Sequence, residues 1–318
     1  MGKRRSGRSS YLTMIWDSVA LMVVRLTIGL IYILPAALGI WIARGCILLI
    51  LIFMPRSVPV GMRNLELIFP ELPKPLRRRI LLRSLDVLAR NILSFAKLPS
   101  LTKARAAALI DYDDALALIN RVRSEHPGVG VIIATLHFGS FEQIIQIHAL
   151  LDKPMSILAR GFGLPRLDRW WNDRRELFGN RVFFRKGGYA EIVRELSRGT
   201  SVSILFDQNV KVNHATFIDF FGIPAATTKG LGYASLRTGA PVIFAVNYQT
   251  GPSRYQMVAE EVTIEYPESS PPEERVNLLM KELHRLSERE IRAHPEQWFW
   301  IHRRFKTRPA GESETIYS

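Results

Sequence analysis

The sequence predicts an α/β fold in which a layered, largely parallel central sheet is flanked by helices and preceded by an N-terminal membrane-embedded helix. Two observations lead to this prediction. Strand-like and helix-like runs alternate through the second half of the 318-residue chain, and a long apolar zone lies near its start. Alternation of this kind is typical of a parallel sheet covered by helices, in which ligands meet the carboxyl ends of the strands.

The apolar zone covers residues 19–54 and is interrupted only by Arg25 and Arg44. The eighteen uncharged residues between them would span about 27 Å as a helix, close to the thickness of a bilayer core. We expect one membrane-embedded segment, kinked at Pro35, with residues 45–54 continuing it along the interface. A secretory signal peptide is the alternative, but the zone is longer than such peptides have.

After this zone the sequence predicts helices and strands in turn. The helix expected at 75–96 has an apolar face and a basic face, and the basic face is either solvated or in contact with anionic lipid headgroups. A second helix is expected at 102–125. Residues 220–228 read as an apolar loop ending in a helix cap, either packed on the protein or forming a wall for a lipid chain. Beyond residue 127, strands are expected at 129–136, 155–159, 202–206, 242–247 and 255–264, and helices at 141–151, 165–178, 189–197, 228–238 and 272–293.

The same composition changes predict the domain limits. We expect a basic tail and membrane anchor at 1–55, one folded domain at 56–309 and a flexible tail at 310–318. Within the folded domain, 56–126 is expected to be helical and 127–309 to be the α/β part.

The charge balance limits the classes of partner. Lys and Arg exceed Asp and Glu by 14, and the pI is about 10.2. This favours a polyanion: nucleic acid, an acidic membrane face, an acidic carrier protein or a phosphorylated substrate. Cys46 is the only cysteine, and the seven histidines lack metal-ligand spacing, so neither an internal disulfide nor a metal is expected.

The most informative stretch is residues 136–143, Leu-His-Phe-Gly-Ser-Phe-Glu-Gln, between an expected strand and an expected helix. On one continuous helix His137 and Glu142 would point about 140° apart. If His137 ends the strand and the chain turns at Gly139, Glu142 falls in the first helical turn and can reach back to the imidazole. Ser140 and Gln143 have the spacing of a capping box, which supports a helix start here.

A carboxylate that holds one imidazole nitrogen leaves the other free as a general base, as in acyl-transfer sites. His137 and Glu142 are therefore the candidate catalytic residues. The alternative is a structural histidine beside a glutamate that favours the positive end of a helix.

Three further segments are candidates for substrate contact. Asp207 and Gln208 end a buried strand, where they would orient a substrate or brace the site. Arg174 and Arg175 follow two tryptophans and form either a surface cluster or a bidentate phosphate clamp. Residues 294–309 mix aromatic and basic side chains, a pattern that suits nucleic acid bases or, beside a membrane segment, lipid phosphates.

Taken in order, these motifs resemble the bacterial lipid A biosynthesis (late) acyltransferase family, which is related to the wider glycerolipid acyltransferases. The resemblance covers nearly the whole chain, and its most specific piece is the C-terminal run. The matching stretches are Arg-Asn-Leu-Glu-Leu-Ile-Phe-Pro-Glu-Leu at 63–72, His-Phe-Gly-Ser-Phe-Glu at 137–142, Asp-Gln at 207–208, Phe-Phe-Gly-Ile-Pro-Ala-Ala-Thr-Thr at 220–228, Thr-Gly-Ala-Pro-Val at 238–242 and Pro-Glu-Gln-Trp-Phe-Trp-Ile-His-Arg-Arg-Phe-Lys-Thr-Arg-Pro at 295–309.

The resemblance implies a glycerolipid acyltransferase-like fold and an enzyme at the cytoplasmic face of the bacterial inner membrane. Such an enzyme moves a fatty acyl group from acyl carrier protein to a hydroxyl of a phosphorylated glycolipid, a lipid A precursor, without a cofactor. His137 would be the base with Glu142 as its partner. Arg175 or the adjacent Arg174, together with Asp207 and Gln208, would contact substrate.

Other functions stay open on the sequence. Relatives acylate other glycolipids, including mannosylated phosphatidylinositol with acyl-CoA as donor, and residues 209–213 depart from the family's usual basic pattern. A membrane-anchored lipid-binding protein without turnover is the alternative of another class. An apolar groove reaching His137 would favour the enzyme, and its absence the binding protein. Nucleic acid is not expected as a partner, and there is no Gly-x-Ser-x-Gly motif for an acyl-enzyme.

Overall fold

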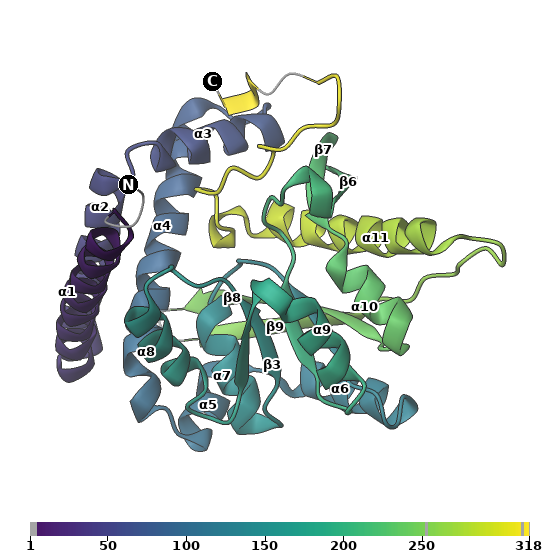
Figure 1. Ribbon diagram of the computed structural model, residues 1–318, viewed down its shortest axis with the longest axis horizontal. Coiled ribbons are helices and arrows are strands. Elements are labelled where there is room, and N and C mark those ends of the chain that lie inside the picture. Colours follow the sequence, from purple (N-terminus) through teal and green to yellow (C-terminus); the bar gives the residue numbers. More distant parts are fainter. Residues whose placement is uncertain (1–4, 252–253, 313–314, 318) are drawn as a thin grey trace.

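A seven-stranded sheet forms the centre of the computed structural model, which describes residues 5–251, 254–312 and 315–317 (Figure 1). The strand order is β1-β9-β8-β2-β5-β3-β4, and every neighbouring pair is parallel except β8 and β9. The largely parallel sheet predicted from the sequence is confirmed. The strands are β1 (Ile110–Asp111), β2 (Ile132–Thr135), β3 (Ser156–Ala159), β4 (Arg181–Phe184), β5 (Val202–Leu205), β8 (Val242–Gly251) and β9 (Arg254–Glu261).

Helices cover both faces of this sheet. Successive side chains of a strand point to opposite faces, so Ile132 and Ala134 of β2 lie in one apolar core and Val131 and Ile133 in another. The first core is closed by α9 (Arg185–Leu196), α10 (Gly230–Thr238) and α11 (Pro272–Ala293), and the second by α5 (Lys103–Leu109), α6 (Asp113–Glu125) and α7 (Phe141–Leu151).

Two N-terminal helices replace the single kinked segment expected from the sequence. They are α1 (Arg5–Ile33) and α2 (Ala36–Phe53), which lie side by side against α4 (Lys74–Lys97) (Figure 1). The chain breaks at Pro35, which is the N-cap of α2, because proline cannot donate the hydrogen bond that a continuous helix needs.

Both helices are long and apolar enough to cross a membrane, and only 17% of each apolar window is buried within the protein. This fits the predicted membrane-embedded N-terminus. Part of the expected basic tail belongs to α1, which begins at Arg5, whereas Lys3 and Arg4 lie outside the described residues.

Two further expectations are corrected. The single helix expected at 102–125 is broken at Ile110–Asp111, which pairs with β9 as a short strand. The expected loop at 220–228 is a hairpin of β6 (Ala215–Phe220) and β7 (Ile223–Thr228). Its two turn residues have positive φ, as a tight hairpin turn requires. Pro224 within β7 obscured the strand pattern, since proline is tolerated only at sheet edges.

The C-terminal segment returns from α11 to the carboxyl ends of the strands. There Phe138, after β2, forms a bridge with Trp298. The segment then passes below α3 (Ser57–Ile68), where Asn64 donates to the carbonyl of Trp300 over 2.6 Å. The hydroxyl of Tyr317 donates to Asn64 over 2.6 Å, so part of the stretch expected as a flexible tail contacts α3.

Candidate active site

His137 and Asp207 follow neighbouring parallel strands, β2 and β5, and meet at their carboxyl ends. The imidazole Nδ1 lies 2.7 Å from Oδ1 of Asp207, and the backbone N–H of His137 donates to Oδ2 over 3.0 Å. The indole N–H of Trp298 also donates to Oδ2, over 2.9 Å. The carboxylate is therefore fixed by three hydrogen bonds from two distant segments of the chain.

The Asp207 side chain is 4% exposed, and burial by itself raises the pKa of a carboxyl group. The attraction of His137 and the hydrogen bonds from His137 and Trp298 outweigh burial and lower the pKa of Asp207 to about 2. An ionised Asp207 requires Nδ1 of His137 to carry a proton, which leaves Nε2 as an acceptor. Nε2 lies 3.2 Å from the amide nitrogen of Gln208.

Glu142 contacts Arg175, which corrects the expected contact with His137. The guanidinium Nε donates to one carboxylate oxygen over 3.0 Å, and Nη2 donates to the other. Both side chains are mostly buried, and attraction to Glu142 outweighs burial and raises the pKa of Arg175. Glu142 does lie in the first turn of α7, as expected. The position that it was expected to take on the imidazole is occupied by Asp207.

Arg174 and Arg175 end helix α8 (Pro165–Arg175) and have different surroundings. Arg174 stacks on Trp170, 4.7 Å from the ring centre, and burial lowers its pKa. Arg175 lines the same pocket as His137. The structure thus distinguishes the two candidates, because only Arg175 faces the candidate site.

The turn between His137 and α7 is held by Asn91 of α4 and Asn247 of β8. Gly139 has φ +55°, and a Cβ there would lie 1.9 Å from the carbonyl oxygen of Asn247. The side chain of Asn91 donates to the Gly139 carbonyl over 2.7 Å, and the Ser140 N–H donates to Asn247 Oδ1 over 3.0 Å. Ser140 is the N-cap, but the expected capping box does not form, because its hydroxyl donates to the Gln143 side chain.

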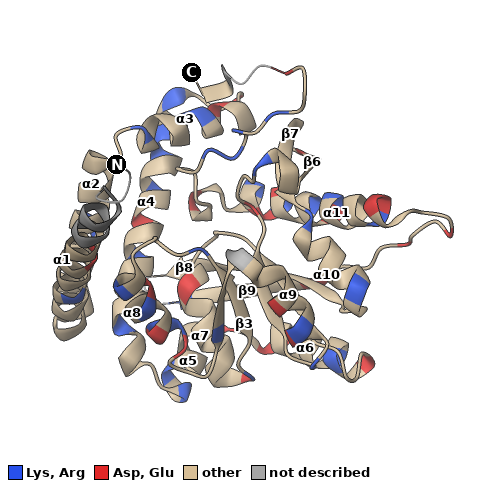
Figure 2. Ribbon diagram, in the orientation of Figure 1, with Lys and Arg blue, Asp and Glu red and all other residues tan. Residues whose placement is uncertain are grey.

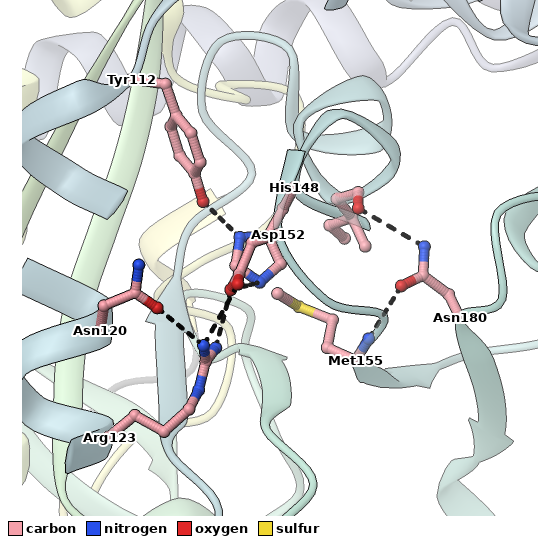
Figure 3. Close-up of polar contacts among 8 residues, drawn as sticks. Tyr112, Asn120, Arg123, His148, Asp152, Met155 and Asn180 are labelled. Carbon is pink, nitrogen blue, oxygen red and sulfur yellow. Dashed lines mark hydrogen bonds and ion pairs between the residues drawn. The ribbon is translucent and has the colours of Figure 1, made fainter. Parts of the chain in front are cut away.

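A second polar cluster fixes the other end of α7. Figure 3 shows Tyr112 and Asp152 on either side of His148, with Arg123 bonded to Asp152 over 2.8 Å. Burial lowers the pKa of His148, so the imidazole is neutral. None of these four residues lines the pocket at His137.

Asn180 links this region to Arg175. Its Oδ1 accepts from the Met155 N–H over 3.0 Å (Figure 3), and its amide nitrogen lies 3.3 Å from Gln146 Oε1. Gln146 in turn donates to the carbonyl of Arg175 over 2.7 Å. Helix α7, which carries Glu142, is therefore bound to the end of α8, which carries Arg175.

The pocket has a volume of about 440 Å³ and reaches His137, Glu142, Arg175 and Gln208. Its wall combines apolar side chains, among them Ile145, Leu158 and Phe162, with polar and charged ones, and the apolar part suits a hydrocarbon chain. In the described part of the chain, no group of three His, Cys, Asp or Glu residues could hold a metal. The arrangement offers an oriented imidazole, an ion pair and a partly apolar wall. A cavity with a partly apolar wall that reaches His137 favours an enzyme over a non-catalytic binding protein.

Comparison with known proteins identifies the family. The sequence profile of the bacterial lipid A biosynthesis acyltransferases matches residues 13–307. The chain belongs to this family. It is therefore an acyltransferase.

Several relatives with names from lipid A biosynthesis are similar over most of their length. The lipid A biosynthesis lauroyltransferase of Escherichia coli K12 is 27% identical over 95% of this chain and 93% of its own. The palmitoleoyltransferase of the same organism is 28% identical over 82% of each chain. The myristoyltransferase is 25% identical over 78% of this chain and 75% of its own.

Sequence reasoning missed Trp298, Asn91 and Asn247 as parts of the candidate site. For Trp298 a signal was present, because it lies in the most specific family motif. For Asn91 and Asn247 the sequence contains no such signal, since their contacts depend on how α4 and β8 pack around the turn. His137 and Asp207 were both expected just after strands of one parallel sheet, but which strands are neighbours was not predicted, so their contact was missed as well.

Proposed function

We propose that this enzyme transfers a fatty acyl group from the thioester of acyl carrier protein to a hydroxyl of a lipid A precursor, with His137 as general base. The main support is the hydrogen-bonded His137–Asp207 pair, with His137 lining a pocket that has a partly apolar wall. The relatives named as lauroyl-, palmitoleoyl- and myristoyltransferases of lipid A biosynthesis support the substrate class.

In this mechanism the acceptor hydroxyl displaces the Gln208 amide from Nε2 of His137. Nε2 takes the hydroxyl proton while the oxygen attacks the thioester carbonyl. The tetrahedral intermediate collapses, the carbon–sulfur bond breaks, and the imidazolium returns its proton to the leaving thiolate. Asp207 keeps the imidazole in the required tautomer and stabilises the imidazolium.

Glu142 and Arg175 have a supporting role in the proposal. Glu142 holds the guanidinium of Arg175 at the pocket, where it attracts the oxyanion or the thioester oxygen that precedes it. Glu142 is then a positioning residue, and its partner is Arg175 instead of the base.

The location of the reaction follows from the substrates. Helices α1 and α2 expose many large apolar side chains, among them Trp41, Ile52 and Phe53, and we place them in the inner membrane. The catalytic domain then faces the cytoplasm, where acyl carrier protein is found. The positive net charge of the chain suits both an acidic carrier and a phosphorylated lipid.

The test is transfer of a labelled acyl chain from acyl carrier protein to a lipid A precursor by the purified enzyme, with mass spectrometry of the product. We expect His137→Ala to lose transfer by a factor on the order of 10² or more. His126→Ala is the matched control, because His126 ends α6 before the amino end of β2, whereas His137 follows the carboxyl end of that strand. Wild-type rates in His137→Ala would refute the assignment. Faster transfer from acyl-CoA to mannosylated phosphatidylinositol would favour that alternative reaction.

A further inference from the structure

A second cavity, of about 700 Å³, adjoins the candidate active site. It lies between the end of α2, the start of α3 and the C-terminal segment. Arg160, which directly follows β3, lines both this cavity and the pocket at His137. Asn209, next to Gln208, lines the second cavity as well. The two spaces are therefore neighbours at the same edge of the sheet.

Among the residues that the structure describes, four cationic side chains and no acidic one line this cavity: Arg56, Arg160, Arg303 and Lys306. None of the four has an ion pair among the residues that the structure describes. Figure 2 shows basic residues along α3, the adjoining part of α4 and the C-terminal segment. Unpaired cations gathered around one concavity indicate an anionic ligand.

Neighbouring arginines in the same segment have structural roles. Arg304 is fully buried and donates to the carbonyl of Ala226 over 2.7 Å and to the hydroxyl of Thr227 over 2.6 Å. Arg308 donates to the carbonyl of Pro224 over 2.6 Å and pairs with Glu312. The fold thus uses Arg304 and Arg308 internally and leaves Arg303 and Lys306 for a ligand.

The position of the cavity indicates which anion it binds. Its rim includes Phe53 and Met54 at the end of apolar helix α2, and their side chains are 82% and 59% exposed. If α2 lies in a bilayer, its end is at the depth of the lipid headgroups, where phosphates are found. An acidic carrier protein would instead need a broad docking surface of roughly 800 Å².

We propose that this cavity binds a phosphate group of the acceptor glycolipid and so presents the acceptor hydroxyl to His137. The inference rests on the proposed function and assigns to Arg56, Arg160, Arg303 and Lys306 the recognition of the acceptor. Guanidinium groups bind phosphate oxygens through paired hydrogen bonds, and a lysine adds a mobile positive charge. Arg160 connects the two sites, because it borders both the phosphate and the reacting groups.

The decisive experiment compares the wild type with Arg303→Gln/Lys306→Gln. Steady-state transfer is measured with a phosphorylated lipid A precursor and with the same lipid after its phosphates are removed. We expect the KM for the phosphorylated acceptor to rise by a factor on the order of 10, whereas the KM for acyl carrier protein stays constant. With the dephosphorylated acceptor, the variant and the wild type should have the same high KM.

Arg237→Gln is the matched control for loss of charge, because Arg237 is exposed on α10 and does not line the cavity. It should leave both KM values unchanged. Thermal unfolding of each variant checks that the fold is intact. A rise in the KM for acyl carrier protein alone would assign the cavity to the donor and overturn the proposal. Weaker binding to phosphatidylglycerol vesicles with an unchanged acceptor KM would assign it to bulk lipid and also overturn it.

A binding measurement separates this inference from the proposed function. In a His137→Ala background, equilibrium binding of the phosphorylated precursor to the full-length protein needs no turnover. We expect the added Arg303→Gln/Lys306→Gln changes to weaken this binding about tenfold. If the wild type transfers no acyl group but this loss of affinity is found, the proposed function fails and the phosphate site stands. Equal affinities would overturn the phosphate site alone.

Discussion

The imidazole Nδ1 of His137 lies 2.7 Å from Oδ1 of Asp207, although the two residues are 70 positions apart in the chain. Strands β2 and β5 pair in parallel with Thr135 opposite Leu205, so the residues after each strand meet at the same edge. The contact is therefore a consequence of the sheet order. It gives the candidate base an ionised partner from a neighbouring strand.

Asp207→Asn should reduce acyl transfer by about 10²- to 10⁴-fold, because an amide does not fix the tautomer or stabilise the imidazolium. Trp298→Phe is the matched control: it removes the other side-chain hydrogen bond to Asp207 and leaves the His137 contact in place. Its loss of activity should be much smaller. Single-turnover kinetics of both variants is the measurement. Equal losses would contradict a specific role of the Asp207–His137 contact in acyl transfer.

Glu142 and Arg175 should behave as one unit. Glu142→Gln leaves a mostly buried guanidinium unpaired, and Arg175→Gln leaves a carboxylate unpaired. If Glu142 acts through Arg175, the double variant loses no more activity than the worse single variant. A double-mutant cycle on kcat tests this. Fully additive losses would show that Glu142 also acts elsewhere, for example directly on His137.

The sequence predicted most elements of the fold, because their signals are local. Helices were predicted at 272–293 from apolar spacing and at 141–151 from an apolar run. Helices α11 and α7 have these same limits. The hairpin at 215–228, the four-residue strand β4 and the two-residue strand β1 were missed. A proline in the hairpin and the shortness of β4 and β1 weaken the pattern by which strands are recognised.

The partner of His137 illustrates the limit for the site. Glu142 is close in sequence, which made it the expected partner, whereas Asp207 is brought in only by pairing of β2 with β5. Strand order is a non-local property, and no spacing in the sequence encodes it. The Glu142–Arg175 pair likewise depends on the packing of α7 against the end of α8.

Gly139→Ala should destabilise the protein more than Gly128→Ala. Both glycines have positive φ, but a Cβ at Gly128 meets no atom within 4 Å, whereas at Gly139 it meets the Asn247 carbonyl. Gly128→Ala should cost about 1–2 kcal/mol from backbone strain alone. Gly139→Ala adds a clash in a tightly held turn, and we expect a cost of at least about 3 kcal/mol. Thermal unfolding measures the loss of stability in each variant. Equal losses would contradict the close contact between Gly139 and the Asn247 carbonyl.

His284 should make the fold sensitive to acid. Its Nε2 accepts from Arg304 over 3.0 Å, and burial, assisted by the charge of Arg304, lowers its pKa from 6.5 to about 3. Below pH 6.5 His284 is protonated in the unfolded chain but stays neutral in the folded chain. The stability contribution is therefore complete above pH 6.5 and is lost as the pH falls toward 3.

Between pH 6.5 and 5 this histidine should account for a loss of about 2 kcal/mol in the free energy of unfolding. Thermal unfolding across that range measures the effect, and His284→Gln should flatten the profile even if it lowers stability at neutral pH. His148, whose pKa burial also lowers, should add a change in the same direction. If the pH dependence of unfolding were the same in His284→Gln as in the wild type, His284 would not be its source.

Membrane attachment should depend on the outward face of α2 more than on its packed face. Trp41, Leu48 and Ile52 are 66%, 63% and 69% exposed, whereas Ala43 and Ile47 are buried near α4. Each exposed side chain that enters a bilayer contributes about 1–2 kcal/mol, so the triple change to Gln should weaken vesicle binding by orders of magnitude without altering thermal stability. Vesicle flotation measures this. Leu177→Gln/Val212→Gln removes exposed apolar groups outside α1 and α2 and should leave flotation unchanged. If both variants float like the wild type, α2 does not anchor the protein.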